Sequence, residues 1–155
     1  MSPFSCKSWL IVNKKATYQY EILERWEAGI VLKGTEVKSI REGGVSFTDS
    51  FVRIRRGEVF LYNLHIAPYS ATSFEYDPKR ERKLLLHKSQ IRKLTGILTQ
   101  KGLTLIPLCI YFKKNKVKVE IGLAKGKKLY DKREKIKRKT VERETRHILK
   151  YKNFK

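Results

Sequence analysis

Residues 104–112 read TLIPLCIYF, residues 117–123 read VKVEIGL, and KKNK at residues 113–116 joins the two runs. The second run alternates: apolar residues at 117, 119, 121 and 123 are separated by Lys118, Glu120 and Gly122. Such alternation is typical of a β-strand that turns one face to a core. The two runs therefore predict an antiparallel hairpin in a mainly β fold.

Shorter runs before this hairpin predict further strands. Apolar and β-favouring residues gather at 9–12, 18–31, 51–54 and 59–66, and Gly29 is a candidate bend in the longest run. Two segments change to helical spacing and end near glycines, at 34–41 and 91–98. Residues 68–82 are polar and predict irregular structure. Closing short antiparallel strands into a barrel removes their exposed edges. We therefore predict a mainly β fold with short helices, in which residues 1–124 form a small, closed, antiparallel OB-like β-barrel.

The last 31 residues, 125–155, form a basic tail with 14 Lys or Arg and only 4 Asp or Glu. Their few apolar residues are too scattered to pack by themselves, so the free segment is expected to be disordered. Three of the acids precede a base by four positions, at Asp131/Lys135, Glu134/Arg138 and Glu142/Arg146. This order favours helical ion pairs of about 0.2–0.5 kcal/mol each. We expect the tail to become helical when it is bound, although a solvated tail without a specific role is the alternative.

The formal net charge of +21 indicates a polyanionic partner. Nucleic acid is the first candidate and an anionic membrane surface the second. The membrane is disfavoured because no window approaches 18 apolar residues and the tail lacks an amphipathic face. The start of the chain has no pattern of a secretion signal. Cys6 and Cys109 match no metal-ligand spacing, and we expect free thiols in a reducing cytoplasm.

Catalytic chemistry has little support in the sequence. The histidines, His65, His87 and His147, share no metal-ligand spacing, and no phosphate-binding glycine loop is present. RNA binding is better supported, because tyrosines and tryptophans are interleaved with basic residues and can stack on bases. Core packing is the alternative for each aromatic. In Leu84-Leu85-Leu86, which follows a dense basic loop, core packing competes with an exposed apolar wedge.

Five blocks of sequence follow one another along the chain: NKKA at 13–16, EAGIVL at 27–32, GTEVKSIR at 34–41, DPKRERKLLL at 77–86 and GKKLYDKR at 126–133. In this order, they resemble the small protein B (SmpB) family of SsrA-binding proteins. The resemblance implies a cytoplasmic adaptor of trans-translation that is not an enzyme and needs no cofactor or metal. It implies two partners, transfer-messenger RNA and the decoding region of the small ribosomal subunit, and no membrane. We expect the free protein to be a monomer.

The resemblance also assigns residues. The expected contacts to transfer-messenger RNA are Asn13, Tyr20, Glu27, Lys38, Arg41, Arg80, Arg82, Lys83 and Leu85. The expected ribosome contacts in the tail are Gly126, Lys127, Lys128, Tyr130, Asp131, Lys132 and Arg133. Glu27 is unusual in a basic site. It either accepts hydrogen bonds from base amino groups or forms an internal ion pair with an arginine. Asp131 is a candidate cap for the tail helix.

Two other functions stay open from the residues. A basic OB-fold ribosomal protein would also combine a small barrel with a basic tail, but it would be present at about one copy per ribosome. An RNA-modifying enzyme would need a cofactor site, for which the sequence shows no motif. Sequencing of the RNA that the protein retains distinguishes these alternatives from the adaptor.

Overall fold

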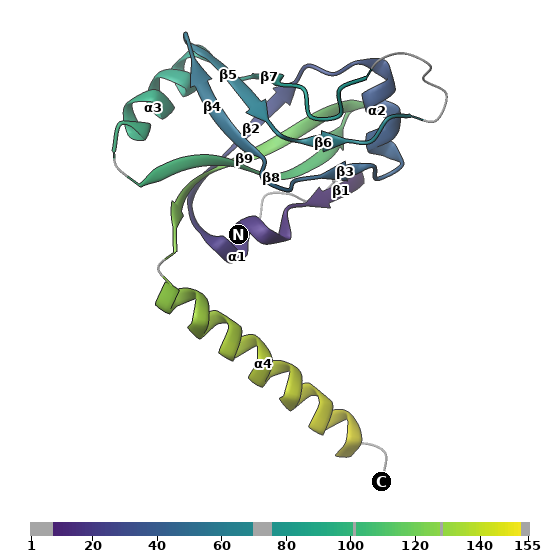
Figure 1. Ribbon diagram of the computed structural model, residues 1–155, viewed down its shortest axis with the longest axis vertical. Helices are drawn as coiled ribbons and strands as arrows, with labels where there is room; N and C mark the ends of the chain where they lie inside the picture. Colours follow the sequence, from purple (N-terminus) through teal and green to yellow (C-terminus); the bar gives the residue numbers. More distant parts are fainter. Residues whose placement is uncertain (1–7, 70–75, 101, 128, 153–155) are drawn as a thin grey trace.

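The structure is a computed structural model that describes residues 8–69, 76–100, 102–127 and 129–152 (Figure 1). It is mainly β, as predicted. The strands are β1 (Ser8–Val12), β2 (Tyr20–Ile30), β3 (Val45–Ser46), β4 (Phe51–Arg55), β5 (Glu58–Tyr62), β6 (His65–Ile66), β7 (Arg82–Leu85), β8 (Leu103–Lys113) and β9 (Lys116–Gly126). The helices are α1 (Lys14–Gln19), α2 (Gly34–Arg41), α3 (Lys88–Leu98) and α4 (Leu129–Lys152).

The predicted hairpin is the longest in the fold. Strands β8 and β9 pair antiparallel from Leu103↔Lys125 to Lys113↔Lys116. Lys114 and Asn115 form the two-residue turn, and both have positive φ angles, 47° and 60°. Tight hairpins favour such turns because their twist matches that of the strands. The hairpin prediction is therefore confirmed, with the turn inside KKNK.

The strands of the main sheet follow the order β1-β8-β4-β5-β7-β2-β9, and β8 also pairs with β9. The pairings between described strands of this sheet are antiparallel. The pairing thus returns from β9 to β8, and β3 and β6 form a separate short ladder. The main core draws on residues of these strands, among them Val59, Leu61, Ile110, Val119 and Ile121.

Strand β9 is buried on more than the one face that its alternation predicts. Glu120 is only 3% exposed. Gly122 lies against Leu108 and Ile22, which belong to a second cluster together with Ala16 of α1. The one-sided prediction was wrong here because α1 covers part of the outer face of the hairpin.

Three other differences concern element boundaries. The expected strand 18–31 begins at Tyr20, because α1 occupies Lys14–Gln19 and Asn13 caps this helix. The expected strand 59–66 is divided into β5 and β6 around Asn63, which has a φ of 56°. Arg82, placed at the end of an irregular segment, begins β7. Helices α2 and α3 match the predicted segments closely.

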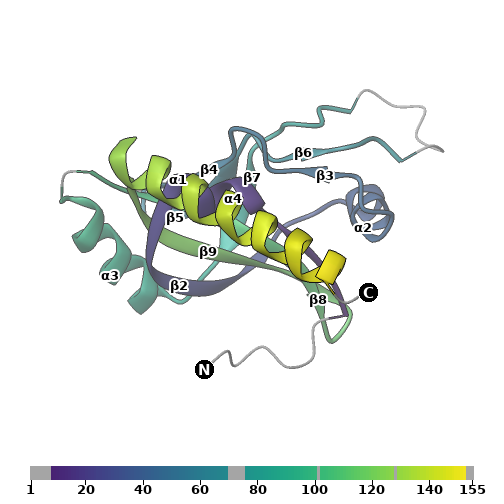
Figure 2. The same ribbon diagram turned by 90° about the horizontal axis from the view of Figure 1, so that it is seen from below.

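Helix α4 projects away from the strands. The chain leaves the sheet at a point next to α1 (Figures 1 and 2). At this junction, the Lys127 amide donates to Gln19 O at 3.2 Å and Lys127 Nζ donates to Thr17 O at 3.1 Å. Farther along, Lys139 Nζ lies 5.9 Å from the centre of the Tyr18 ring. No helix within the described ranges has both the length and the hydropathy needed to cross a membrane.

Candidate RNA-binding surface

A hollow of about 720 Å³ lies where β2, β7, β9 and the start of α3 meet. Three of the predicted RNA contacts line it: Glu27, Lys83 and Leu85. We call this hollow the β2–β7 pocket. Glu27 and Lys83 are 56 positions apart in the sequence, so the fold brings together residues that the sequence could link only through the resemblance.

Leu85 gives the pocket an exposed apolar side chain. It is 53% exposed, while its neighbour Leu84 is 2% exposed and part of the core. The alternation of β7 therefore divides the leucine run: Leu84 packs inward and Leu85 points outward. Leu85 pairs with Gly29 of β2, where a Cβ atom would lie 3.2 Å from Leu85 Cβ. The exposed-wedge interpretation holds for Leu85, and Gly29 leaves room beside it.

Glu27 is the acidic centre of the pocket. Tyr111 of β8 donates its hydroxyl hydrogen to Glu27 Oε2, and Lys113 Nζ lies 3.0 and 3.1 Å from the two carboxylate oxygens. The Tyr111 hydrogen bond, with help from Lys113 and against partial burial, lowers the pKa of Glu27 below its ordinary value. Glu27 thus does have an internal ion pair, but its partner is a lysine rather than the arginine that we considered.

Cationic side chains surround this carboxylate. Lys83 Nζ pairs with Glu58 Oε1, and both side chains are largely exposed. Lys118, on β9, lines the pocket and contributes to the lowered pKa of Glu27. Sequence reasoning missed Lys118, although its position between Val117 and Val119 marked it as outward-facing. The pocket therefore offers cations for phosphates, a leucine for a base or sugar face, and carboxylate acceptors at Glu27 and Glu58.

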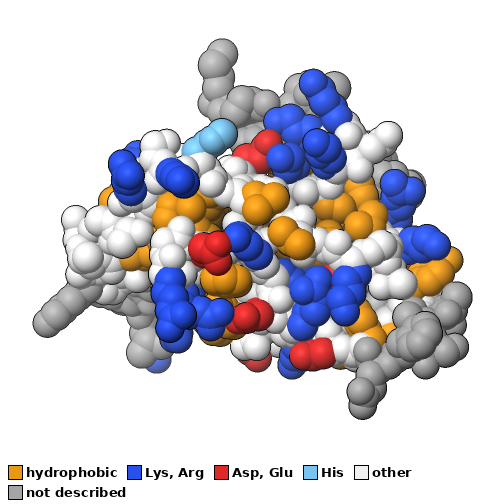
Figure 3. Space-filling model, turned by 90° about the horizontal axis from the view of Figure 1, so that it is seen from above, with side chains coloured by type: hydrophobic (Ala, Val, Ile, Leu, Met, Phe, Trp, Pro, Cys, Tyr) orange, Lys and Arg blue, Asp and Glu red, His pale blue; other side chains and the backbone are white. Residues whose placement is uncertain are grey.

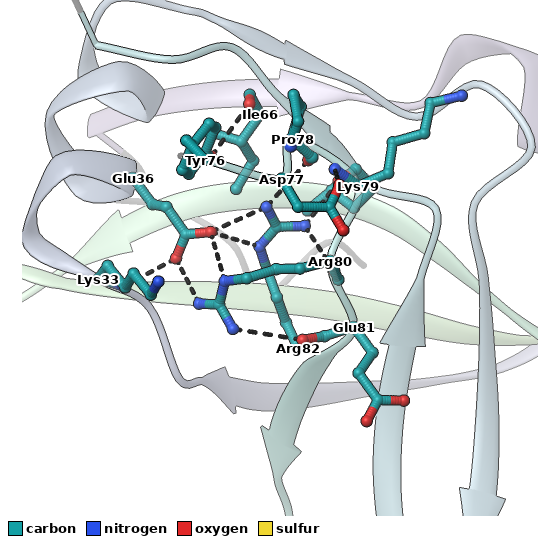
Figure 4. Close-up of polar contacts among 11 residues, drawn as sticks. Lys33, Glu36, Ile66, Tyr76, Asp77, Pro78, Lys79, Arg80, Glu81 and Arg82 are labelled. Atoms are coloured by element: carbon teal, nitrogen blue, oxygen red, sulfur yellow. Dashed lines mark hydrogen bonds and ion pairs between the residues drawn. The ribbon is translucent and has the colours of Figure 1, made fainter. Parts of the chain in front are cut away.

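A second cluster of charges lies inside the domain, around Glu36 of α2 (Figure 4). The Glu36 side chain is fully buried. Its carboxylate accepts hydrogen bonds from Arg80 Nε and Nη2 at 2.9 and 2.5 Å, from Arg82 Nε at 2.9 Å, and from the Lys33 amide at 2.7 Å. Burial raises the pKa of Glu36, but these hydrogen bonds outweigh it and leave the pKa below its ordinary value.

The same cluster explains where two predicted RNA contacts lie. Arg82 is fully buried, and its guanidinium also donates to Leu64 O, Arg80 O and Pro78 O. Its side chain has no surface to offer to RNA, so we leave it out of the surface proposed below. Arg80 keeps 26% of its side chain exposed. Together, Arg80 and Arg82 fix the segment that leads into β7, and therefore the positions of Lys83 and Leu85 on that strand.

Helix α2 carries two more predicted contacts. Lys38 Nζ lies 5.4 Å from the centre of the Tyr69 ring, and the guanidinium carbon of Arg41 lies 5.5 Å from the centre of the Phe112 ring. Both are cation–π distances. Viewed from the side opposite α4, Lys and Arg side chains surround patches of hydrophobic side chains, with fewer acidic groups between them (Figure 3). This interleaving of charge and apolar surface suits a folded RNA.

Asn13 and Tyr20 lie in a different hollow, of about 310 Å³, between α1 and the segment around Phe47. The Asn13 side chain is used inside the protein: Oδ1 accepts from the Ala16 amide at 3.2 Å, and Nδ2 donates to Pro107 O at 2.9 Å. The structure therefore places Asn13 as the cap that fixes α1 on β8, while Tyr20 stands at the start of β2.

The predicted ribosome contacts follow β9. Gly126 is the last residue of β9 and pairs with Tyr20. Lys128 and the side chains of Tyr130, Asp131 and Lys132 lie outside the described part of the structure, so the cap expected at Asp131 is not described either. Helix α4 begins at Leu129, and Arg133 in its first turns is exposed. Within the described ranges, no group of His, Cys, Asp or Glu side chains is arranged to hold a metal ion.

These features define a class. A strongly cationic, mainly β domain with a pocket of lysines, a leucine and two carboxylates has the chemistry of an RNA-binding protein. The SmpB protein family model matches residues 10–151, and the chain belongs to this family.

Individual relatives agree with the family match. The SsrA-binding protein of Syntrophobacter fumaroxidans is 61% identical over 133 residues, which cover 85% of this chain and 83% of the relative. The SsrA-binding protein of Aquifex aeolicus is 62% identical over 134 residues, 85% of each chain. A chain of the solved structure "tmRNA-SmpB: a journey to the center of the bacterial ribosome" is 56% identical, with a TM-score of 0.67 over 79% of this chain and 87% of that chain.

Proposed function

We propose that this protein is an RNA-binding adaptor of trans-translation, which binds the tRNA-like domain of transfer-messenger RNA and delivers that RNA to stalled ribosomes. The observation that carries the proposal is membership of the SmpB family, whose relatives are named SsrA-binding proteins. The solved structure that names transfer-messenger RNA, SmpB and the ribosome together supports it. An adaptor at the ribosome works in the cytoplasm and transfers no chemical group itself.

The RNA-binding unit in this proposal is a closed OB-like barrel formed by residues 1–124. The return of pairing from β9 to β8 supports closure. OB-folds bind nucleic acids on a strand face and on flanking loops. Because β9 continues to Gly126 and Lys127 is bonded to α1, we place the start of the independent tail after Lys127.

The β2–β7 pocket is the proposed centre of RNA recognition. Lys83 and Lys118 hold phosphates, and Leu85 packs against an unstacked base or a sugar. Glu27 accepts a hydrogen bond from a base amino group or a 2′-hydroxyl. The cations supply most of the affinity, which depends on salt, while the carboxylate supplies discrimination. Lys38, Arg41 and the exposed part of Arg80 extend the surface toward α2.

The tail is the proposed ribosome-binding unit. In this proposal it is disordered in the free protein and becomes a helix in the vacant decoding site and message channel. The described helix α4 and its ion pair Arg146 Nη2–Glu142 Oε1, at 2.9 Å, show that the sequence is compatible with a helix. The contacts would come from residues 126–133, where β9 ends and the tail begins, among them Lys127, Lys132 and Arg133.

Recovery of the protein from its native cytoplasm, followed by sequencing of the retained RNA, tests the function. The adaptor is expected to retain one RNA far above its cellular share and to be substoichiometric to ribosomes. A basic OB-fold ribosomal protein would instead appear at about one copy per ribosome with ribosomal RNA alone. That second result would overturn the proposed function.

A further inference from the structure

One hydrogen bond connects the β2–β7 pocket with the interior of the domain. Tyr111 of β8 is 1% exposed, and its hydroxyl reaches the carboxylate of Glu27, whose side chain is 32% exposed. The Tyr111 ring is buried in the domain. Its hydroxyl contacts the Glu27 carboxylate, which lines the β2–β7 pocket. A buried tyrosine hydroxyl needs a polar partner, and Glu27 supplies one here.

The direction of this hydrogen bond is fixed by the two ionisation states. Burial and the nearby Glu27 carboxylate raise the pKa of Tyr111 well above its ordinary value, while the pKa of Glu27 is lowered. At neutral pH Tyr111 is therefore the donor and Glu27 the ionised acceptor. A carboxylate has about four acceptor positions, and Tyr111 and Lys113 use part of this capacity. Acceptor capacity remains for a ligand donor in the pocket.

Tyr111 and Lys113 hold the carboxylate in different ways. Lys113 is 53% exposed, so its contact is screened by solvent. The Tyr111 ring is buried in the domain, so packing fixes its position. A fixed donor behind one carboxylate oxygen restricts rotation of the whole group and so orients the remaining acceptor positions.

We propose that Tyr111 is a positioning residue for RNA recognition, which orients the Glu27 carboxylate. The inference rests on the proposed function, in which Glu27 reads a donor group of the RNA. Tyr111 does not touch RNA itself. Its contribution is to specificity, because a freely rotating carboxylate would accept hydrogen bonds from many donors at many angles.

Other charged groups near Glu27 are the background for any test that uses pH. On β8 and β9 these are Lys113, Lys118 and Glu120, the cross-strand partner of Glu27; on β5 and β7 they are Glu58 and Lys83, and at the start of α3 they are His87 and Lys88. None of these side chains is changed by Tyr111→Phe. The substitution removes a single oxygen atom and keeps the ring that packs in the domain.

A double-mutant cycle with the full-length protein tests the proposal. Affinity for the isolated tRNA-like domain of transfer-messenger RNA is measured for wild type, Tyr111→Phe, Glu27→Gln and the double variant, with bulk tRNA as the non-cognate competitor. Tyr111→Phe is expected to reduce cognate affinity about tenfold, the effect of one hydrogen bond to a charged group, and to leave tRNA affinity almost unchanged. In the Glu27→Gln background it should change cognate affinity less than twofold.

Two further measurements separate positioning from stability. Tyr62→Phe makes the same chemical change on β5, where the ring stacks on Phe51 at 5.3 Å, and should leave cognate affinity unchanged. An NMR titration of the Glu27 carboxyl carbon should give a higher pKa in Tyr111→Phe than in wild type, because the largest cause of its lowering is gone. Both readouts use folded protein, and an unchanged Glu27 pKa in Tyr111→Phe would show that Tyr111 does not hold this carboxylate and would overturn the inference.

The outcomes distinguish the inference from the proposed function. If Glu27→Gln reduces cognate affinity but Tyr111→Phe does not, the inference is overturned and the function of Glu27 stands. If Tyr111→Phe has the same effect in both backgrounds, it acts on the fold and the inference is again overturned. If Glu27→Gln leaves cognate affinity unchanged, the proposed role of Glu27 fails, and the positioning role of Tyr111 fails with it.

Discussion

Glu36 is a buried residue that stabilises the strand carrying two residues of the proposed RNA-binding surface. Its buried carboxylate joins Arg80 and Arg82, which are 44 and 46 positions away in the sequence. Through Arg82 it fixes the first residue of β7, the strand that presents Lys83 and Leu85. The negative charge of Glu36 would repel RNA, yet it holds in place the strand that carries Lys83 and Leu85.

Glu36→Gln is expected to lower the free energy of unfolding by about 3–5 kcal/mol at neutral pH, because it leaves buried guanidinium charge uncompensated. The pKa of Glu36 is lower in the folded than in the unfolded protein. This stabilisation is therefore present above the unfolded pKa and disappears as the pH falls through the folded pKa. Urea unfolding at several pH values measures both effects.

Glu58→Gln is the matched control, since Glu58 is exposed and pairs with exposed Lys83. It should cost less than about 1 kcal/mol. Equal losses for Glu36→Gln and Glu58→Gln would contradict the structural role of the buried cluster.

We expect Leu85 to be the opposite case, a residue that matters for binding and little for stability. Leu85→Ala should change the free energy of unfolding by less than about 0.5 kcal/mol, because the side chain is half exposed. It should weaken binding of the tRNA-like domain by about 1–3 kcal/mol if a base packs on it. Leu84→Ala, one position away in the core, is the control and should cost about 2–5 kcal/mol of stability. The interpretation of Leu85 fails if its substitution unfolds the protein or leaves RNA binding intact.

At the scale of elements, the β8–β9 hairpin requires a glycine for packing. A Cβ atom at Gly122 would lie 2.8 Å from Leu108 Cδ1 and 3.2 Å from Ile22 Cγ2. Gly122→Ala should therefore destabilise the protein by about 1–3 kcal/mol through overpacking. Gly126→Ala on the same strand has no atom within 4 Å of the new Cβ and should have a much smaller effect. Thermal unfolding of the two variants measures the difference, and equal midpoints would refute it.

Elements were predictable from the sequence where their pattern is local. The hairpin at 104–123 follows from alternation, and α2 and α3 follow from spacing and nearby glycines. Helix α1 was missed because it has only six residues and depends on the Asn13 cap, whose side chain is fixed by Pro107 O far along the chain. Strand β7 was missed because its start depends on Arg82, whose partner Glu36 lies on another element.

The candidate site was predictable only in part, because it too depends on contacts between segments that are distant in the sequence. The sequence offered Glu27, Lys83 and Leu85 through the resemblance, and the fold gathers these three in one pocket. The sequence could not show that Tyr111 donates a hydrogen bond to Glu27, or that Arg82 is buried, because both facts depend on contacts between distant segments. Periodicity indicates which face of a strand is buried but does not identify the neighbours of that face.

At the scale of the whole molecule, charge is divided between two units. The tail after Lys127 holds 12 of the 36 Lys and Arg residues, and its helix α4 projects from the β domain (Figure 1). We expect Lys132→Ala with Arg133→Ala to reduce the salt slope of ribosome association by roughly one unit for each lost phosphate contact. Binding of isolated transfer-messenger RNA should hardly change. Paired salt titrations measure this, and a loss confined to the isolated RNA would reverse the assignment of the two surfaces.

The central claim is that the β domain binds the RNA and the tail acts at the ribosome. The most direct measurement compares the full chain with a chain ending at Lys127, which keeps the whole of β9 and the contacts of Lys127 with α1. Both are assayed for affinity to the tRNA-like domain and for peptide tagging on stalled ribosomes in a reconstituted system. The predicted result is unchanged RNA affinity and lost tagging. Normal tagging by the shortened chain, or loss of its RNA binding while it remains folded, would contradict the account.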